Sequence, residues 1–244
     1  MRQTVQRMAA GNGGALSAAA RPRRQRPNKG HNACTICFHT IGDPMTIDHF
    51  AHKAGSYDAS QGRVDNVQNI ADAIRGAFPL DRSMHLMDFG SGTGLLLQKL
   101  APHVGTITAV DVSPSMQSQL RAKQATLACA VEIVEIDLEV NDLARTFDGI
   151  VSSMTMHHIR DIDAIFGKFH SMVREGGFIA IADLDLEDGS FHAEDTGVHH
   201  LGFDRARIAR SAADAGFRMV QVASASVVHK DSRDYPIFLL TATR

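Results

Sequence analysis

The segment that decides the fold is Asp88-Phe89-Gly90-Ser91-Gly92-Thr93-Gly94. It ends a short apolar run, His85 to Phe89, that predicts a buried strand, and it precedes the largely apolar run Leu95 to Leu100, which suits a helix. Three glycines at alternate positions allow positive φ and let the main chain approach a ligand beside the N–H groups of a helix N-terminus. The segment therefore predicts a strand, a ligand-binding turn and a helix.

Strand and helix signals alternate on both sides of this turn. The predicted helices are about 63–78, 113–125, 161–174 closed by Gly176-Gly177, and 204–215. The other predicted strands are 107–110, 131–136, 149–153, 178–182, 217–224 and 235–241. Strands separated by helices imply βαβ units, so we expect an α/β fold with a doubly wound, mostly parallel, seven-stranded sheet. The last two strands have no helix between them and should form an antiparallel pair at one edge.

The composition is that of an ordinary soluble domain, with 44% hydrophobic and 21% charged residues in 244. No run approaches the ~18 consecutive apolar residues of a membrane span, so we expect no membrane partner. The chain's three cysteines are too few for a disulfide framework. This favours a reducing compartment and predicts a cytoplasmic location.

Charge is divided unevenly along the chain. The overall charge is −2, but residues 1–44 hold seven basic residues and one acidic residue, which leaves 18 basic and 26 acidic residues in 45–244. Residues 45–244 therefore carry a net charge of −8, which repels phosphate backbones. We expect no nucleic-acid partner.

Residues 1–44 predict a disordered, basic, Gly/Ala-rich tail, because they hold too few apolar residues for a core. Their Arg-rich character permits a mitochondrial transit peptide, but we favour an over-extended reading frame whose working start is Met45. Potential zinc ligands occur within nine residues: His31, Cys34, Cys37 and His39. Structural zinc sites usually join two separated ligand pairs, so we expect no metal here.

Five motifs in order, over residues 47–244, resemble those of class I S-adenosylmethionine-dependent methyltransferases, specifically the small-molecule type similar to quinone-biosynthesis enzymes. The motifs are Asp88 to Gly94, Val110 to Met116, Ile136-Asp137-Leu138, Phe147 to Ile159, and Arg174 to Gly177. The rival dinucleotide fingerprint needs glycine or alanine where this chain has Leu95. An NAD(P)-dependent oxidoreductase is therefore the less favoured enzyme.

Asp111 ends the second predicted strand, where a carboxylate can accept both ribose hydroxyl protons. The resemblance implies that Asp137 and the Leu138 amide meet adenine, and that Asp88 and the glycines hold the methionine moiety. Val112 and Met116 would pack on the adenine side, and Tyr57 would close over the methionine end. The full set predicted to bind S-adenosylmethionine is Tyr57, Asp88, Gly90, Ser91, Gly92, Gly94, Asp111, Val112, Met116, Asp137, Leu138 and Ser153.

The acceptor side is expected to be rich in histidine. Histidines gather in the loops that should surround the crevice: His49, His52, His157, His158, His192, His199 and His200. We predict His157 as the catalytic base, needed only if the acceptor must lose a proton. The acids and histidines of 183–200 would also suit a divalent ion, but a hydrogen-bonded acceptor pocket is favoured, so no metal is predicted.

Together these features predict one methyltransferase domain, residues 45–244, that methylates a small molecule and acts as a monomer or homodimer. The stretch Ser152-Ser153-Met154-Thr155 lacks the Asn/Asp-Pro-Pro-aromatic element that the resemblance would require for methylation of adenine or glutamine amino groups. A second class of alternative is a non-catalytic cofactor-binding interaction module on the same fold.

Overall fold

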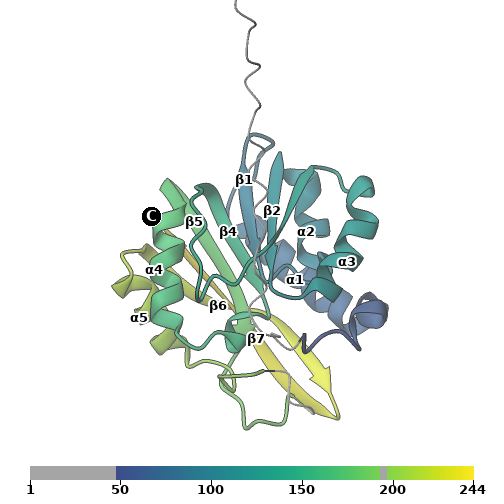
Figure 1. Cartoon of the computed structure of the whole chain (residues 1–244). Helices are drawn as coiled ribbons and strands as arrows, with labels where there is room; N and C mark the ends of the chain where they lie inside the picture. Colours follow the sequence, from purple (N-terminus) through teal and green to yellow (C-terminus); the bar gives the residue numbers. More distant parts are fainter. Residues whose placement is uncertain (1–47, 193–196) are drawn as a thin grey trace, which may run out of the picture. The chain divides into compact units, whose positions relative to one another are not determined.

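A single seven-stranded sheet, in the order β3-β2-β1-β4-β5-β7-β6, organises the chain (Figure 1). The computed structural model describes residues 48–192 and 197–244. The strands are β1 (His85–Phe89), β2 (Thr106–Asp111), β3 (Ala130–Glu135), β4 (Phe147–Ser153), β5 (Val173–Leu184), β6 (Arg218–Lys230) and β7 (Arg233–Thr243). The predictions for 1–44, including the tail, the zinc ligands and the start at Met45, lie outside the described residues.

The sheet is parallel except at β7, which pairs antiparallel with both β5 and β6. The pairs β1–β2, β1–β4, β2–β3 and β4–β5 are all parallel. The predicted fold class is confirmed, with the antiparallel hairpin at one edge.

Three of the five helices in the described ranges begin at a side-chain cap. The five helices are α1 (Gln61–Ala77), α2 (Leu95–Leu100), α3 (Pro114–Lys123), α4 (Ile162–Met172) and α5 (Arg205–Asp214). Short 3-10 turns are η1 (Ala54–Ala59), η2 (Ala101–His103), η3 (Gln124–Thr126) and η4 (Met156–His158). Ser113, Asp161 and Asp204 each accept a hydrogen bond from the N–H three residues later and so fix the starts of α3, α4 and α5.

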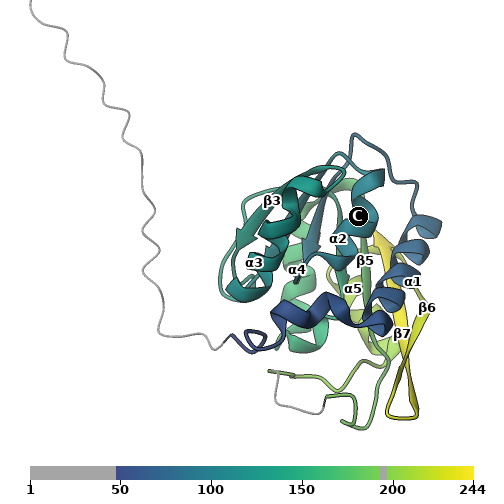
Figure 2. The same cartoon turned by 90° about the vertical axis from the view of Figure 1, so that its right-hand side faces the viewer.

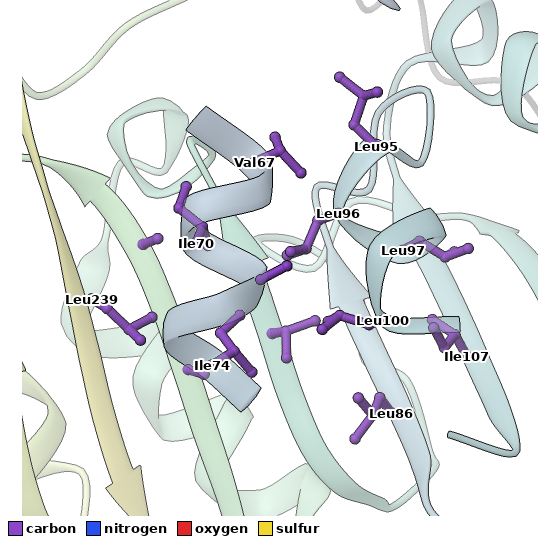
Figure 3. Close-up of a cluster of buried hydrophobic side chains, with 14 of the residues drawn as sticks. Val67, Ile70, Ile74, Leu86, Leu95, Leu96, Leu97, Leu100, Ile107 and Leu239 are labelled. Carbon is purple, nitrogen blue, oxygen red and sulfur yellow. The ribbon is translucent and has the colours of Figure 1, made fainter. Parts of the chain in front are cut away.

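Two hydrophobic clusters, one on each face of the sheet, hold the helices in place. On one face α1 and α2 pack against the strands, with Ile70, Ile74, Leu97, Leu100 and Leu86 fully buried (Figure 3). On the other face α4 and α5 cover Met87 and its neighbours. Adjacent strand residues such as Leu86 and Met87 point to opposite faces, which explains why the strand is apolar throughout.

The predicted helix stop at Gly176-Gly177 is wrong. Helix α4 ends at Met172, and β5 already begins at Val173, which pairs with Phe147 across a register shift. A Cβ at Gly177 would lie 2.6 Å from the Asp148 carbonyl oxygen. The two glycines therefore accommodate an irregularity within β5 and do not end a helix.

The C-terminal hairpin is longer than the sequence pattern indicated. Strand β6 continues to Lys230, and the two-residue turn Asp231-Ser232 has positive φ at both residues, as a tight hairpin requires. Strands β5 and β6 both run antiparallel to β7, so the hairpin tip lies at the carboxyl ends of the parallel strands. Figures 1 and 2 show this tip and the segment after β5 extending past the same end of the sheet.

Among the helices of the described ranges, none has both the length and the apolar character to cross a membrane.

Candidate functional site

A cavity of about 600 Å³ opens at the carboxyl ends of β1, β2, β3 and β4. Every residue of the predicted cofactor set lines it except Gly94, which lies just behind it at the start of α2. Its other walls come from η1 and α1 near the N-terminus and from the tip of the β6–β7 hairpin. The structure thus brings the predicted residues together, as expected where parallel strands end.

The glycine turn after β1 is held tightly against β2. The N–H groups of Gly90 and Ser91 both donate to the Val110 carbonyl, at 2.8 and 3.0 Å. Gly90, Gly92 and Gly94 all have positive φ. A Cβ at Gly94 would lie 2.5 Å from the Leu120 side chain, whereas one at Gly92 would meet nothing within 4 Å. Gly94 therefore allows close packing against Leu120, whereas the space beside Gly92 is unfilled.

Asp111 ends β2, and both of its carboxylate oxygens face main-chain donors. The Gly92 N–H donates to Oδ2 at 2.7 Å, and the Ser113 N–H donates to Oδ1 at 2.8 Å. Burial raises the pKa of this carboxyl, while these two hydrogen bonds act in the opposite direction. The side chain is oriented before any ligand binds.

Asp88 lies at the base of the cavity and is almost completely buried. Burial, and secondarily the charge of Asp111, raise its pKa to about 7. Its Oδ2, together with Ser91 Oγ and Ser153 Oγ, is buried without a hydrogen-bond partner. Buried polar atoms without partners are costly, so this wall fits a ligand with donors or positive charge, as the ammonium of a methionine moiety provides.

The third strand supplies the far wall of the cavity. Asp137 follows β3 and accepts the Glu139 N–H at 2.8 Å. Leu138 and Met116 are buried beside it, whereas Val112 is 53% exposed. All four predicted residues line the cavity. Leu138 and Met116 also pack in the hydrophobic interior of the domain.

The N-terminal segment is fastened over the glycine turn. Tyr57 lines the cavity from η1, burial raises the pKa of its hydroxyl, and the Arg63 guanidinium lies 4.3 Å from its ring centroid. Thr93 Oγ1 donates to Asp58 at 2.5 Å, and Asp48 accepts from the Ser113 hydroxyl at 2.8 Å. Asp48 and Asp58 were not among the predicted residues, because nothing in their local pattern marks acids that bind distant turns.

Asn66 is another residue that sequence reasoning missed. It is buried on α1, lines the cavity, and its Oδ1 has no partner. An amide on the apolar face of an amphipathic helix, next to Val67 and Ile70, is the signal that would have identified it.

His157 forms a buried pair with Asp183. Its Nδ1 lies 2.7 Å from Asp183 Oδ1, and the two side chains are 2% and 0% exposed. Burial alone would raise the pKa of Asp183, but the charge and hydrogen bonds of His157 and the Leu184 N–H together hold it below the usual value. An ionised Asp183 fixes the His157 tautomer with Nδ1 protonated, which leaves Nε2 to accept a proton.

Two further histidine rings surround His157. The ring centroids of His158 and His192 lie 4.2 and 4.9 Å from that of His157. Burial and the neighbouring imidazole lower the pKa of each to about 4. All three residues line the cavity. His158 and His192 therefore present neutral rings near neutral pH.

The other predicted histidines and acids do not gather at one point. The N–H groups of His199 and His200 donate to the His157 carbonyl, at 2.8 and 3.1 Å. Asp185 is bound bidentately by Arg205 at 2.7 Å, and Asp188 by Arg233 at 2.9 Å. Within the described ranges no three His, Cys, Asp or Glu side chains are placed to hold a metal ion.

The hairpin tip supplies cavity residues that the sequence analysis missed. Phe191, from the segment after β5, lines the cavity together with Val228, His229 and Lys230 of β6. Lys230 Nζ donates to the Phe191 carbonyl at 2.5 Å. Val228, His229 and Lys230 were missed because the predicted strand ended near 224, short of the cavity.

Comparison with known families gives a match over most of this domain. A family model described as a methyltransferase domain matches residues 61–222. An uncharacterized methyltransferase of Schizosaccharomyces pombe is 31% identical over 137 residues, covering 49% of this chain and 48% of that protein. One of Geobacillus sp. is 30% identical over 172 residues, covering 65% of this chain and 79% of that protein. The chain spans about half the length of the Schizosaccharomyces pombe relative.

Solved structures share the fold at low identity. DhpI in complex with SAH has a TM-score of 0.61 and 20% identity, covering 80% of this chain and 92% of that chain. Phosphoethanolamine N-methyltransferase 2 of Haemonchus contortus, in complex with phosphomonomethylethanolamine and S-adenosylhomocysteine, has a TM-score of 0.59 and 17% identity, covering 71% of this chain and 52% of that chain. At such identities the likeness establishes the architecture.

Proposed function

Because the chain belongs to the class I S-adenosylmethionine-dependent methyltransferases, we propose that it methylates a small-molecule acceptor bound in the cavity beside His157. The carrying observation is that one cavity of about 600 Å³ is lined by the cofactor residues other than Gly94 and by His157, whose Nδ1 is held from behind by the buried Asp183. A space of this size, walled by η1 and the hairpin tip, favours a compact acceptor over a polymer.

S-adenosylmethionine supplies an electrophilic methyl group on a sulfonium. We assign the ribose to Asp111, the adenine to Asp137 and Leu138, and the methionine ammonium to the wall around Asp88. The unpartnered oxygens of Asp88, Ser91 and Ser153 support the last assignment, because a cationic donor would satisfy them. Tyr57, across the cavity in η1, would cover the same end.

Most of the catalysis would come from placement. An in-line displacement needs the acceptor atom held close to the methyl carbon, with water excluded. Phe191, Met154 and the histidine rings, which line the cavity, would provide that exclusion. The chain itself then needs no covalent intermediate.

His157 would remove a proton from an acceptor that carries one. Asp183 holds Nδ1, so Nε2 is the nitrogen that accepts the proton, and the resulting imidazolium is stabilised by the carboxylate. A mobile acceptor proton of this kind belongs to hydroxyl, thiol or amine groups.

The test is a transfer assay with S-adenosylmethionine carrying a labelled methyl group. A cell extract of the source organism is separated by ultrafiltration into small molecules and macromolecules, and label is measured in each. We expect label in the filtrate, in products heavier by one CH₂. Label confined to the retained protein or nucleic acid would refute the small-molecule acceptor. An NAD titration in parallel tests the oxidoreductase alternative, and cofactor binding without transfer would favour the non-catalytic module.

The low cysteine content favours action in a reducing compartment such as the cytoplasm, as a monomer or homodimer. Fractionation of the source cells and size-exclusion chromatography test these two points.

A further inference from the structure

The tip of the β6–β7 hairpin carries three basic side chains, and two of them have acidic partners. Arg233 lies 2.9 Å from Asp188, and His229 Nδ1 lies 2.5 Å from Asp234. Lys230 is half-buried and lines the cavity. Its polar contact among the described residues is with the Phe191 carbonyl, and no carboxylate there lies within 4.0 Å of Nζ.

The Lys230 ammonium has more hydrogen-bond donors than the described residues around it accept. Nζ carries three N–H donors, and the Phe191 carbonyl accepts one of them. A bound anion would accept from the remaining donors, and such charge-assisted hydrogen bonds are stronger than neutral ones. The carbonyl contact holds the ammonium beside Phe191.

A row of rings connects Lys230 to the proposed base. Lys230 Nζ lies 5.6 Å from the Phe191 ring centroid. The Phe191 and His192 centroids lie 4.9 Å apart, as do those of His192 and His157. Lys230 and His157 are therefore connected through Phe191 and His192, and all four residues line the cavity.

Lys53 and Arg63 line the cavity from the start of η1 and from α1. Charge where β2 and β3 end has the other sign, because Asp111, Asp137 and Glu139 line the cavity there. An acidic acceptor would be disfavoured there and attracted to Lys230, so the polarity of the cavity would also set the direction in which the acceptor enters.

Resting on the proposed function, we propose that the acceptor is an acidic small molecule whose anionic oxygen group pairs with Lys230, while the atom to be methylated lies toward His157. Lys230 is then a specificity-determining residue, and the wall between it and His157 accommodates the body of the acceptor.

The first test extends the transfer assay. The small-molecule filtrate is divided on an anion-exchange resin at neutral pH, and both fractions are incubated with labelled S-adenosylmethionine. We expect label in the retained, acidic fraction. Label found only in the unretained fraction would overturn this proposal and leave the proposed function standing. No label in either fraction, with cofactor binding intact, would overturn both.

The second test compares variants of the full chain. The source of acceptor is a fresh portion of the acidic fraction in which label was found. Lys230→Gln keeps a donor toward the Phe191 carbonyl but removes the charge, and we expect kcat/KM to fall roughly 10–100-fold, mainly through KM. Lys230→Arg should restore most of it. Lys99→Gln, outside the cavity on α2, is the matched control and should have no effect.

Cofactor affinity and thermal stability provide the internal control for these variants. The dissociation constant of S-adenosylmethionine and the melting temperature should be the same in Lys230→Gln and the wild type. An equal KM in both proteins, or a loss that Lys230→Arg fails to recover, would overturn the assignment of Lys230.

Discussion

The N–H of Gly92 donates to Oδ2 of Asp111 across 2.7 Å, which joins the turn after β1 to the end of β2. The Ser113 N–H holds the other carboxylate oxygen at 2.8 Å. Each oxygen retains a further lone pair, so the carboxylate can be oriented by the main chain and still accept two hydroxyl protons. One side chain thus shapes the glycine turn and is available to the cofactor.

Replacing Asp111 with Ala should weaken S-adenosylmethionine binding by about 1.5–3 kcal/mol, because charge-assisted hydrogen bonds are lost. Isothermal titration measures this. Asp72→Ala, an exposed acid on α1, is the control. An unchanged dissociation constant would remove the ribose assignment.

The glycines of the turn should respond differently to alanine. Gly94→Ala places a Cβ 2.5 Å from Leu120 at a φ of +83°, so the melting temperature should fall. Gly92→Ala meets no atom within 4 Å, and its φ of +54° costs about 1–2 kcal/mol. We expect Gly92→Ala to fold and to lose cofactor affinity. Calorimetry and titration separate the two effects, and equal melting temperatures would contradict the packing role of Gly94.

Asp88 should make the cofactor-free protein less stable as pH rises. Its pKa is raised from 3.8 to about 7, so between those values the folded state keeps a proton that the unfolded state releases. The free energy of unfolding therefore falls through that window, by about 4 kcal/mol for this group, and is level above it.

Asp88→Asn removes this titration. Chemical denaturation from about pH 4 to 7 should show the variant gaining stability relative to the wild type as pH rises. Asp214→Asn, an exposed acid at the end of α5, reports the effect of removing a surface carboxylate. A constant difference between Asp88→Asn and the wild type would show that Asp88 is not protonated in this window.

The base role of His157 predicts a loss of turnover with cofactor binding retained. His157→Asn keeps a donor toward Asp183 but lacks Nε2, and turnover should fall roughly 10²–10⁴-fold. Asp183→Asn, which removes the carboxylate that holds Nδ1, should also lower turnover. His103→Ala is the control. Full turnover by His157→Asn would leave the pair a structural one.

Deletion of residues 1–44 should leave the melting temperature and the S-adenosylmethionine affinity nearly unchanged, because their composition lacks core-forming residues. Thermal unfolding and titration of the shortened chain measure both. A loss of either would indicate that the segment docks on the domain.

The cofactor half of the site was predictable because its signals are local. Asp88, the glycines and Asp111 each end a strand or begin a helix, and backbone rules fix such positions within a few residues. The fold followed from the same alternation of strand and helix. Gly176-Gly177 misled the helix boundary, because glycine marks a strand irregularity as well as a helix end.

The acceptor half was predictable only in part. His157 was identified from its motif, but its pairing with Asp183 spans 26 residues and depends on β4 and β5 lying side by side. Lys230 was missed because its place depends on the length of a hairpin whose alternation weakens after 224. Contacts between distant segments leave no periodic trace in one sequence.

The contacts between the segment after β5 and the hairpin have a dynamic consequence. Asp188 to Arg233, Ser190 to Tyr235 and Phe191 to Lys230 are three links between the same two pieces of chain. Segments connected in this way open as one cooperative unit, so their amide hydrogens should exchange with solvent at similar rates. A substitution that loosens one link would then speed exchange at all three, and an acceptor that bridges the unit would slow exchange throughout it.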